Sequence, residues 1–149
     1  MRSLRAYRHS ATEGANHIDI LLACYDALAE DMRLAGQSAL RGDIPARCRH
    51  SEHALLLIGH LESWVSFLDD VNLAASLTNF YEHLRAEVLR LQVSLDFNDY
   101  MNLALVVCEV RATWQKKLST ELSQRGTAAA TQHPLAECDG AIAHFIVSA

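Results

Sequence analysis

The chain has 149 residues, of which 50% are hydrophobic and 21% are charged, and its net charge at pH 7 is −5. This length and composition fit one globular domain with a buried core and exclude a disordered chain. The acidic net charge argues against nucleic-acid binding, which needs a basic surface. Apolar runs are too short to span a membrane, and no apolar segment of a signal peptide follows the basic N-terminus. We therefore expect a cytoplasmic protein.

The first half of the chain predicts two long helices. Apolar residues recur at helical spacing over residues 16–41, after a short N-terminal helical segment. Gly42 is a typical residue to end a helix. Asp43 is expected to cap a second helix, with Pro45 in its first turn, and this helix runs to about Leu68.

The second half predicts two more helices. Residues 69–72 form the expected turn, and the apolar stripe of a third helix covers residues 73–95. Asp96, with Asp99 three residues later, is expected to cap a fourth helix. This helix is apolar nearly all round over residues 101–110, so we expect it to be central in the fold or covered by a partner.

Short turns between long helices predict an all-α fold, an antiparallel up-down four-helix bundle with a short N-terminal helical segment and a C-terminal extension. We assign residues 1–123 to the bundle and residues 124–149 to the extension. Gly126, Thr127 and the alanine run after them suggest a linker, and residues 141–147 form a short apolar segment. The sequence leaves two alternatives for this apolar segment: it docks on the bundle, or it is disordered.

The search for catalytic or metal-binding motifs finds little. His50, His53 and His60 share one side of the second helix, but the chain has no H-E-x-x-H, H-x-x-x-H or ferritin-like E-x-x-H motif. It also has no glycine-rich phosphate loop and no nucleophile elbow. We expect no catalytic residue, no metal and no cofactor. A metal-binding bundle built on the three histidines is the less favoured alternative.

Some apolar side chains lie away from the main stripes of the first two helices. Their spacing of about seven residues places each row on one side of its helix, and an exposed pair of rows would accept an amphipathic helix of a partner. Packing against a neighbouring helix or against the C-terminal extension is the equally weighted alternative. The two rows, here called the seam, are Ile20, Ala27 and Leu34 on the first helix, and Leu56, His60 and Phe67 on the second.

The order of several short segments resembles that of the FliS family of flagellin export chaperones. The similarity spans Ala6 to Lys117, and its strength lies in the order and spacing of the pieces together. The segments that carry it are Ala6-Tyr7, Thr12, the run Ile20-Leu21-Leu22-Ala23-Cys24-Tyr25-Asp26-Ala27, the run from Leu34 to Gly42-Asp43, Phe80-Tyr81, and Arg111-Ala112-Thr113-Trp114-Gln115-Lys116.

The resemblance implies a cytoplasmic chaperone that binds the C-terminal segment of flagellin, prevents its premature polymerisation and assists flagellar type III export. It also implies that Tyr7 acts as a gate over the client groove, with Leu22, Tyr25 and Asp26 near that groove. Further candidate partners are other export components and a second copy of the chain. A diverged regulatory or adaptor bundle is the alternative function. The expected client-binding residues are Tyr7, Ile20, Leu22, Tyr25, Asp26, Leu34, Leu56 and Phe67.

Overall fold

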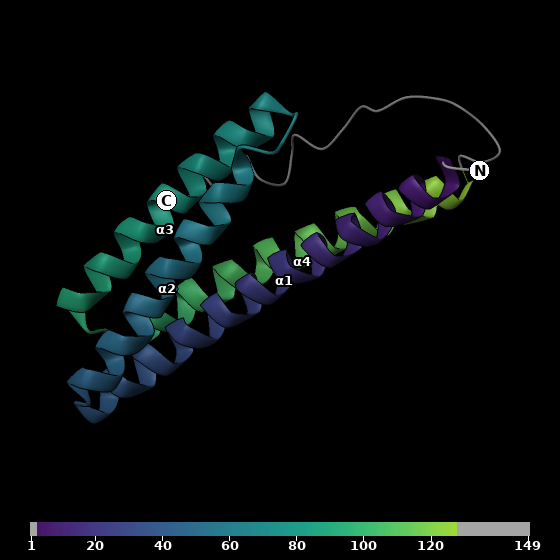
Figure 1. The fold of residues 1–149 in the computed structure, drawn as a ribbon. Coiled ribbons are helices and arrows are strands. Elements are labelled where there is room, and N and C mark those ends of the chain that lie inside the picture. Colours follow the sequence, from purple (N-terminus) through teal and green to yellow (C-terminus); the bar gives the residue numbers. More distant parts are fainter. Residues whose placement is uncertain (1–2, 128–149) are drawn as a thin grey trace.

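The computed structural model describes the backbone of residues 3–127 and the side chains of residues 17–120 (Figure 1). Over this part of the chain it contains four α-helices and no strand, which confirms the all-α four-helix bundle. The helices are α1 (Ser3–Arg41), α2 (Ile44–Val65), α3 (Val71–Ser94) and α4 (Phe97–Thr127).

Helix α1 is the central element of the bundle. It packs against both α2 and α4, whereas α3 packs on α2 and meets α4 only over a short stretch. Figure 1 shows α1 and α4 side by side, extending together beyond the pair formed by α2 and α3. Of the two alternatives expected for the fourth helix, the fold does not give the central position: one side of α4 faces solvent, where Leu105 is 61% exposed and Cys108 is also exposed. The other alternative, a partner that covers this side, stays a prediction.

The helix ends follow from local sequence. Gly42 adopts φ +69°, the left-handed conformation that glycine accepts without strain, and ends α1. An Asp43 carboxylate oxygen accepts a hydrogen bond of 3.0 Å from the amide of Ala46, as expected of a cap. Asp96 likewise accepts a bond of 2.8 Å from the amide of Asn98 at the start of α4. Both predicted caps are confirmed.

The boundaries differ from expectation at several places. Helix α1 begins at Ser3 and runs without a break, so no separate N-terminal helical segment precedes it. Helix α2 ends at Val65, and α3 begins at Val71 because the Asp70 carboxylate accepts the amide hydrogens of the first turn. Helix α4 continues through the expected linker start to Thr127.

The core consists of the inward stripes of all four helices. Its largest fully buried side chains include three tyrosines, one from each of α1, α3 and α4. No helix in the described part of the chain combines the length and hydropathy that a membrane crossing requires. The core side chains with almost no exposure are Tyr25, Leu28, Met32, Ile58, Leu61, Tyr81, Leu84, Val88, Leu91, Tyr100 and Val107.

Candidate functional site

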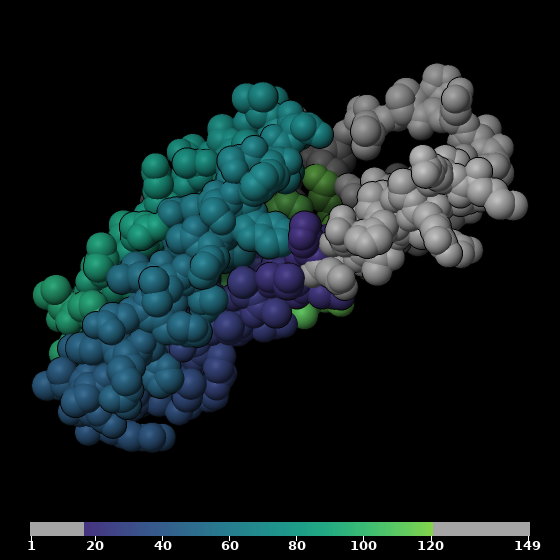
Figure 2. All heavy atoms as spheres, in the orientation of Figure 1, coloured from purple at the N-terminus to yellow at the C-terminus, as the bar shows by residue number. Residues whose placement is uncertain are grey.

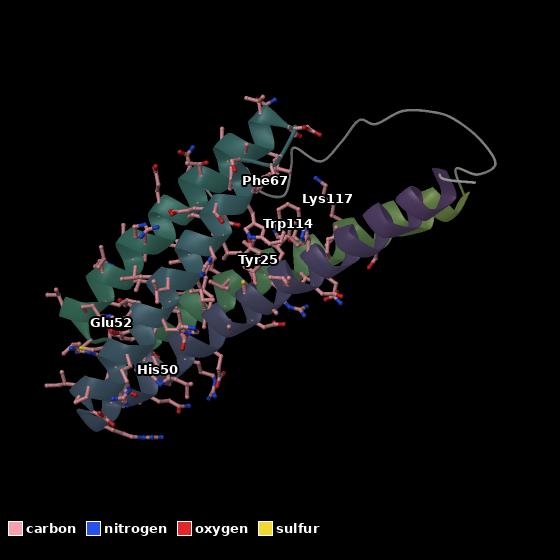
Figure 3. The ribbon with its side chains drawn as sticks, in the orientation of Figure 1. Tyr25, His50, Glu52, Phe67, Trp114 and Lys117 are labelled. Atoms are coloured by element: carbon pink, nitrogen blue, oxygen red, sulfur yellow. The ribbon has the colours of Figure 1, made fainter. Side chains whose placement is uncertain are left out.

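Three of the segments that carry the family resemblance meet inside the bundle. The hydroxyl groups of Tyr25 on α1 and Tyr81 on α3 are hydrogen-bonded to each other. The indole Nε1–H of Trp114 on α4 donates to the Tyr25 hydroxyl over 3.2 Å. Figure 3 shows Tyr25 and Trp114 close together in the middle of the bundle, where the two helix pairs diverge. These bonds tie α1, α3 and α4 together where α3 and α4 barely touch.

Burial of this cluster changes the chemistry of both phenols. Loss of hydration raises the pKa of Tyr25 to about 12, with its hydrogen bonds to Tyr81 and Trp114 opposing the shift. Burial, followed by the nearby Tyr25, raises the pKa of Tyr81 as well. Both phenols are therefore neutral at physiological pH, so the cluster serves as a structural hydrogen-bond network.

A surface ion pair extends the same contact between α1 and α4. Arg111 Nη2 donates to an Asp26 carboxylate oxygen over 3.0 Å, one residue along from Tyr25 on α1 and three residues before Trp114 on α4. The Tyr25-Asp26 and Arg111-x-x-Trp114 motifs thus bind each other. Sequence reasoning had treated them as separate marks of the family, because their pairing depends on the register between two distant helices.

Three of the expected client-binding residues, Leu22, Tyr25 and Asp26, belong to the contact between α1 and α4. Tyr25 has no exposed surface, Asp26 pairs with Arg111, and Leu22 precedes Tyr25 by three residues, on the same α4-facing side of α1. In this conformation Tyr25 cannot touch a client, so its expected contact role is replaced by a structural one. The side chain of Tyr7 lies outside the described residues.

A polar cluster that the sequence did not reveal joins α1 to α2. The Asp31 carboxylate, whose side chain is 9% exposed, bonds to Nδ1 of His50 over 3.0 Å and to Nδ1 of His53 over 2.5 Å. The sequence placed the two histidines together, but their partner lies on another helix. His60 stands two turns beyond His53, and no group of histidine, cysteine or acidic residues in the described part of the chain is placed to hold a metal ion.

The contacts of Asp31 place the two rows of the seam beside each other. On α1, Ala27 lies four residues before Asp31 and Leu34 three residues after it, so both are on the same side of the helix as Asp31. On α2, Leu56 lies three residues after His53, which again puts it on the side of the contact. Because Asp31 bonds to His53 across the interface, both rows flank this one junction of α1 and α2.

A second contact fixes how the rows run. The rings of His17 and Trp64 meet edge to face with 5.4 Å between their centroids. Together with the Asp31 contacts, this makes α1 and α2 antiparallel and places Ala27 level with Leu56 and Ile20 level with His60. From Ile20 to Leu34 the helix rises about 21 Å, or four turns.

The exposed part of the seam is apolar apart from His60. Ile20 is 51% exposed, Leu56 is 66% exposed and Phe67 is 81% exposed, whereas Ala27 and Leu34 are half-buried between them. Figure 3 shows Phe67 at the end of α2 that adjoins the α2–α3 turn, away from His50. In Figure 2, α2 lies at the front of the molecule with α1 beside it. An exposed apolar strip formed by two adjacent antiparallel helices is typical of a site for an amphipathic helix.

Other apolar side chains are exposed outside the seam. Val93 and Leu89 lie on the outer side of α3, and Leu105 lies on α4. The seam differs from these because its apolar residues come from two facing helices, α1 and α2, with Phe67 in the turn that follows α2. Four of the eight expected client-binding residues belong to it, namely Ile20, Leu34, Leu56 and Phe67, and it is the candidate functional site.

A family model covers nearly all of the described part of the chain. A family model described as "Flagellar protein FliS" matches residues 1–121, which includes all of the seam and the Tyr25–Trp114 contact. A comparison with curated proteins gave no match. A family match over most of the chain, combined with a four-helix bundle in which the resembling segments contact each other, shows the relationship. The chain belongs to the flagellar protein FliS family.

Proposed function

We propose that this flagellar export chaperone binds the C-terminal segment of flagellin in the cytoplasm, keeps it from polymerising and assists its export by the flagellar type III apparatus. The observation that carries the proposal is membership of the FliS family, a family of flagellar export chaperones. The seam supplies the physical means, because it exposes apolar surface that a partner helix would cover.

The size and character of the seam suit such a client. An unassembled flagellin terminus has apolar helical faces that find partners only in the filament, and a helix lying along a four-turn strip can bury one such face. Covering Ile20, Leu56 and Phe67 would remove much of the exposed apolar area on this side of the bundle. The binding mode resembles the docking of an amphipathic helix in a hydrophobic groove.

The proposal is tested by producing the protein together with flagellin and measuring co-purification and filament assembly. The wild-type chaperone should co-purify with full-length flagellin, lose it when the flagellin C-terminal segment is deleted, and delay filament assembly in solution. Leu56→Glu should weaken binding by about tenfold or more, because a charge would enter an apolar contact. Val93→Glu is the matched control, since Val93 is 84% exposed but lies on α3.

Circular dichroism separates loss of binding from loss of fold. Both variants change exposed side chains, so both should keep the helicity and unfolding midpoint of the wild type. A folded wild-type protein that neither retains flagellin nor delays its assembly would contradict the proposed function. Equal weakening by Leu56→Glu and Val93→Glu would place the client elsewhere on the bundle.

A further inference from the structure

The end of α4 and the Phe67 end of the seam lie at the same end of the bundle. The His17–Trp64 contact places Phe67 close to the level of His17 or slightly beyond it. The contacts of Tyr25 and Asp26 with Trp114 and Arg111 give the antiparallel register of α1 with α4. Figure 1 shows α4 ending beside the start of α1. Thr127, the last residue of α4, therefore lies about 10–20 Å beyond the level of Phe67 along α1.

The chain after Thr127 is long enough to return to the seam. Residues 128–140 can extend up to about 43 Å. Leu56 lies 11 residues before Phe67, about 16 Å away along α2 and the turn that follows it. The apolar segment from Ala141 to Val147 can therefore reach the Phe67 end of the seam without any change in the bundle.

The chemistry of this segment matches the seam. Residues 141–147 are apolar except for His144. Ile142, Phe145 and Ile146 follow a spacing of three and four residues, so in a helix they would share one face. The family match ends at residue 121, so this segment is an addition to the matched region. An apolar face next to an uncovered apolar strip on the same molecule favours their association, because the connecting chain supplies a high effective concentration.

We propose that residues 141–147 of this chain occupy the seam of the same molecule when no client is bound. The segment then acts as an internal substitute for a partner helix, covering Leu56 and Phe67 from water. Docking itself does not depend on the identity of the client. Its consequence, that a client must displace the tail, rests on the proposed function.

Hydrogen exchange of the full-length protein, read by mass spectrometry, tests the docking without any client. In the wild type, backbone amides of residues 141–147 should exchange about tenfold or more slowly than in an unstructured peptide. Phe67→Glu should abolish this protection by charging the seam, and Phe145→Glu should abolish it by charging the tail. Val93→Glu is the matched control and should leave the protection unchanged.

The same experiment carries the results that would overturn the proposal. Exchange of residues 141–147 at unstructured rates in the wild type would refute docking, and so would protection that survives Phe67→Glu. Protection that disappears on dilution would assign the seam to a second copy of the chain and not to the tail of the same molecule. A failure to bind flagellin would leave these results unaltered, so the two proposals fail separately.

Discussion

Two glycines in helix interiors should respond to alanine in opposite ways. Gly36 lies on α1 where it approaches α4, and a Cβ added there would stand 2.8 Å from Cβ of Tyr100 and 3.3 Å from its Cγ. Gly59 lies on α2, and a Cβ there would meet nothing within 4 Å. The pair therefore measures how tightly α1 packs on α4, with the same chemical change as its own control.

The expected magnitudes follow from these distances. Carbon atoms prefer a separation of about 3.5–4.0 Å, so alanine at position 36 would push α1 and α4 apart by about 1 Å. Side-chain rotation gives no relief, because Cβ of Tyr100 is fixed to its own helix. We take about 3 kcal/mol for this overpacking, less about 1 kcal/mol gained from the helix propensity of alanine. Gly36→Ala should therefore lose about 2 kcal/mol, whereas Gly59→Ala should gain about 1 kcal/mol.

Urea unfolding followed by circular dichroism at 222 nm would measure both variants against the wild type. The free energies of unfolding of Gly36→Ala and Gly59→Ala should differ by about 3 kcal/mol, with the wild type between them. If Gly36→Ala equalled or exceeded the wild type while Gly59→Ala was stabilised, the close approach of α1 and α4 would be refuted.

Two further predictions concern the polar clusters. The raised pKa of Tyr25, about 12, means that the fold holds this phenol neutral, so its contribution to stability is fully present below pH 10 and is lost as pH rises from 10 through about 12, by up to about 1.4 kcal/mol per pH unit. Burial raises the pKa of Tyr81 in the same direction. Tyr25→Phe should cost about 1–2 kcal/mol at pH 8 through its lost hydrogen bonds, and its deficit relative to the wild type should narrow between pH 10 and 12 in urea titrations; a constant deficit would count against the buried network. Asp31→Ala should lower the free energy of unfolding by about 1–3 kcal/mol, because two imidazoles lose their hydrogen-bond acceptor. His53→Ala should lower it by less than about 1 kcal/mol, since the His53 side chain is 56% exposed. Equal losses of stability in thermal unfolding would show that the Asp31 carboxylate does not organise the contact.

Much of the fold could be predicted because its signals are local. The apolar stripes gave four helices, and Asp43 and Asp96 marked two helix starts within a single turn of chain. The start of α1 at Ser3 was missed because the first part of the helix has no clear apolar stripe. The position of α4 stayed open, because an apolar helix can be covered by the fold or by a partner and sequence periodicity does not distinguish the two.

The candidate site was predicted less completely, since its parts come from different helices. Ile20 and Phe67 were found by their spacing, and the structure shows them exposed. Tyr25 was expected near the client, but its hydroxyl reaches Tyr81 and Trp114 and the side chain is buried. Asp31 was missed because its histidine partners lie on α2, and nothing local in the sequence fixes the register between the two helices.

The most direct test of the central claim is a calorimetric titration of the purified protein with the isolated C-terminal segment of its flagellin. The account predicts saturable one-to-one binding that Phe67→Glu weakens about tenfold or more and that Val93→Glu leaves unchanged. Absence of binding to the folded wild-type protein would contradict the claim that this bundle holds flagellin.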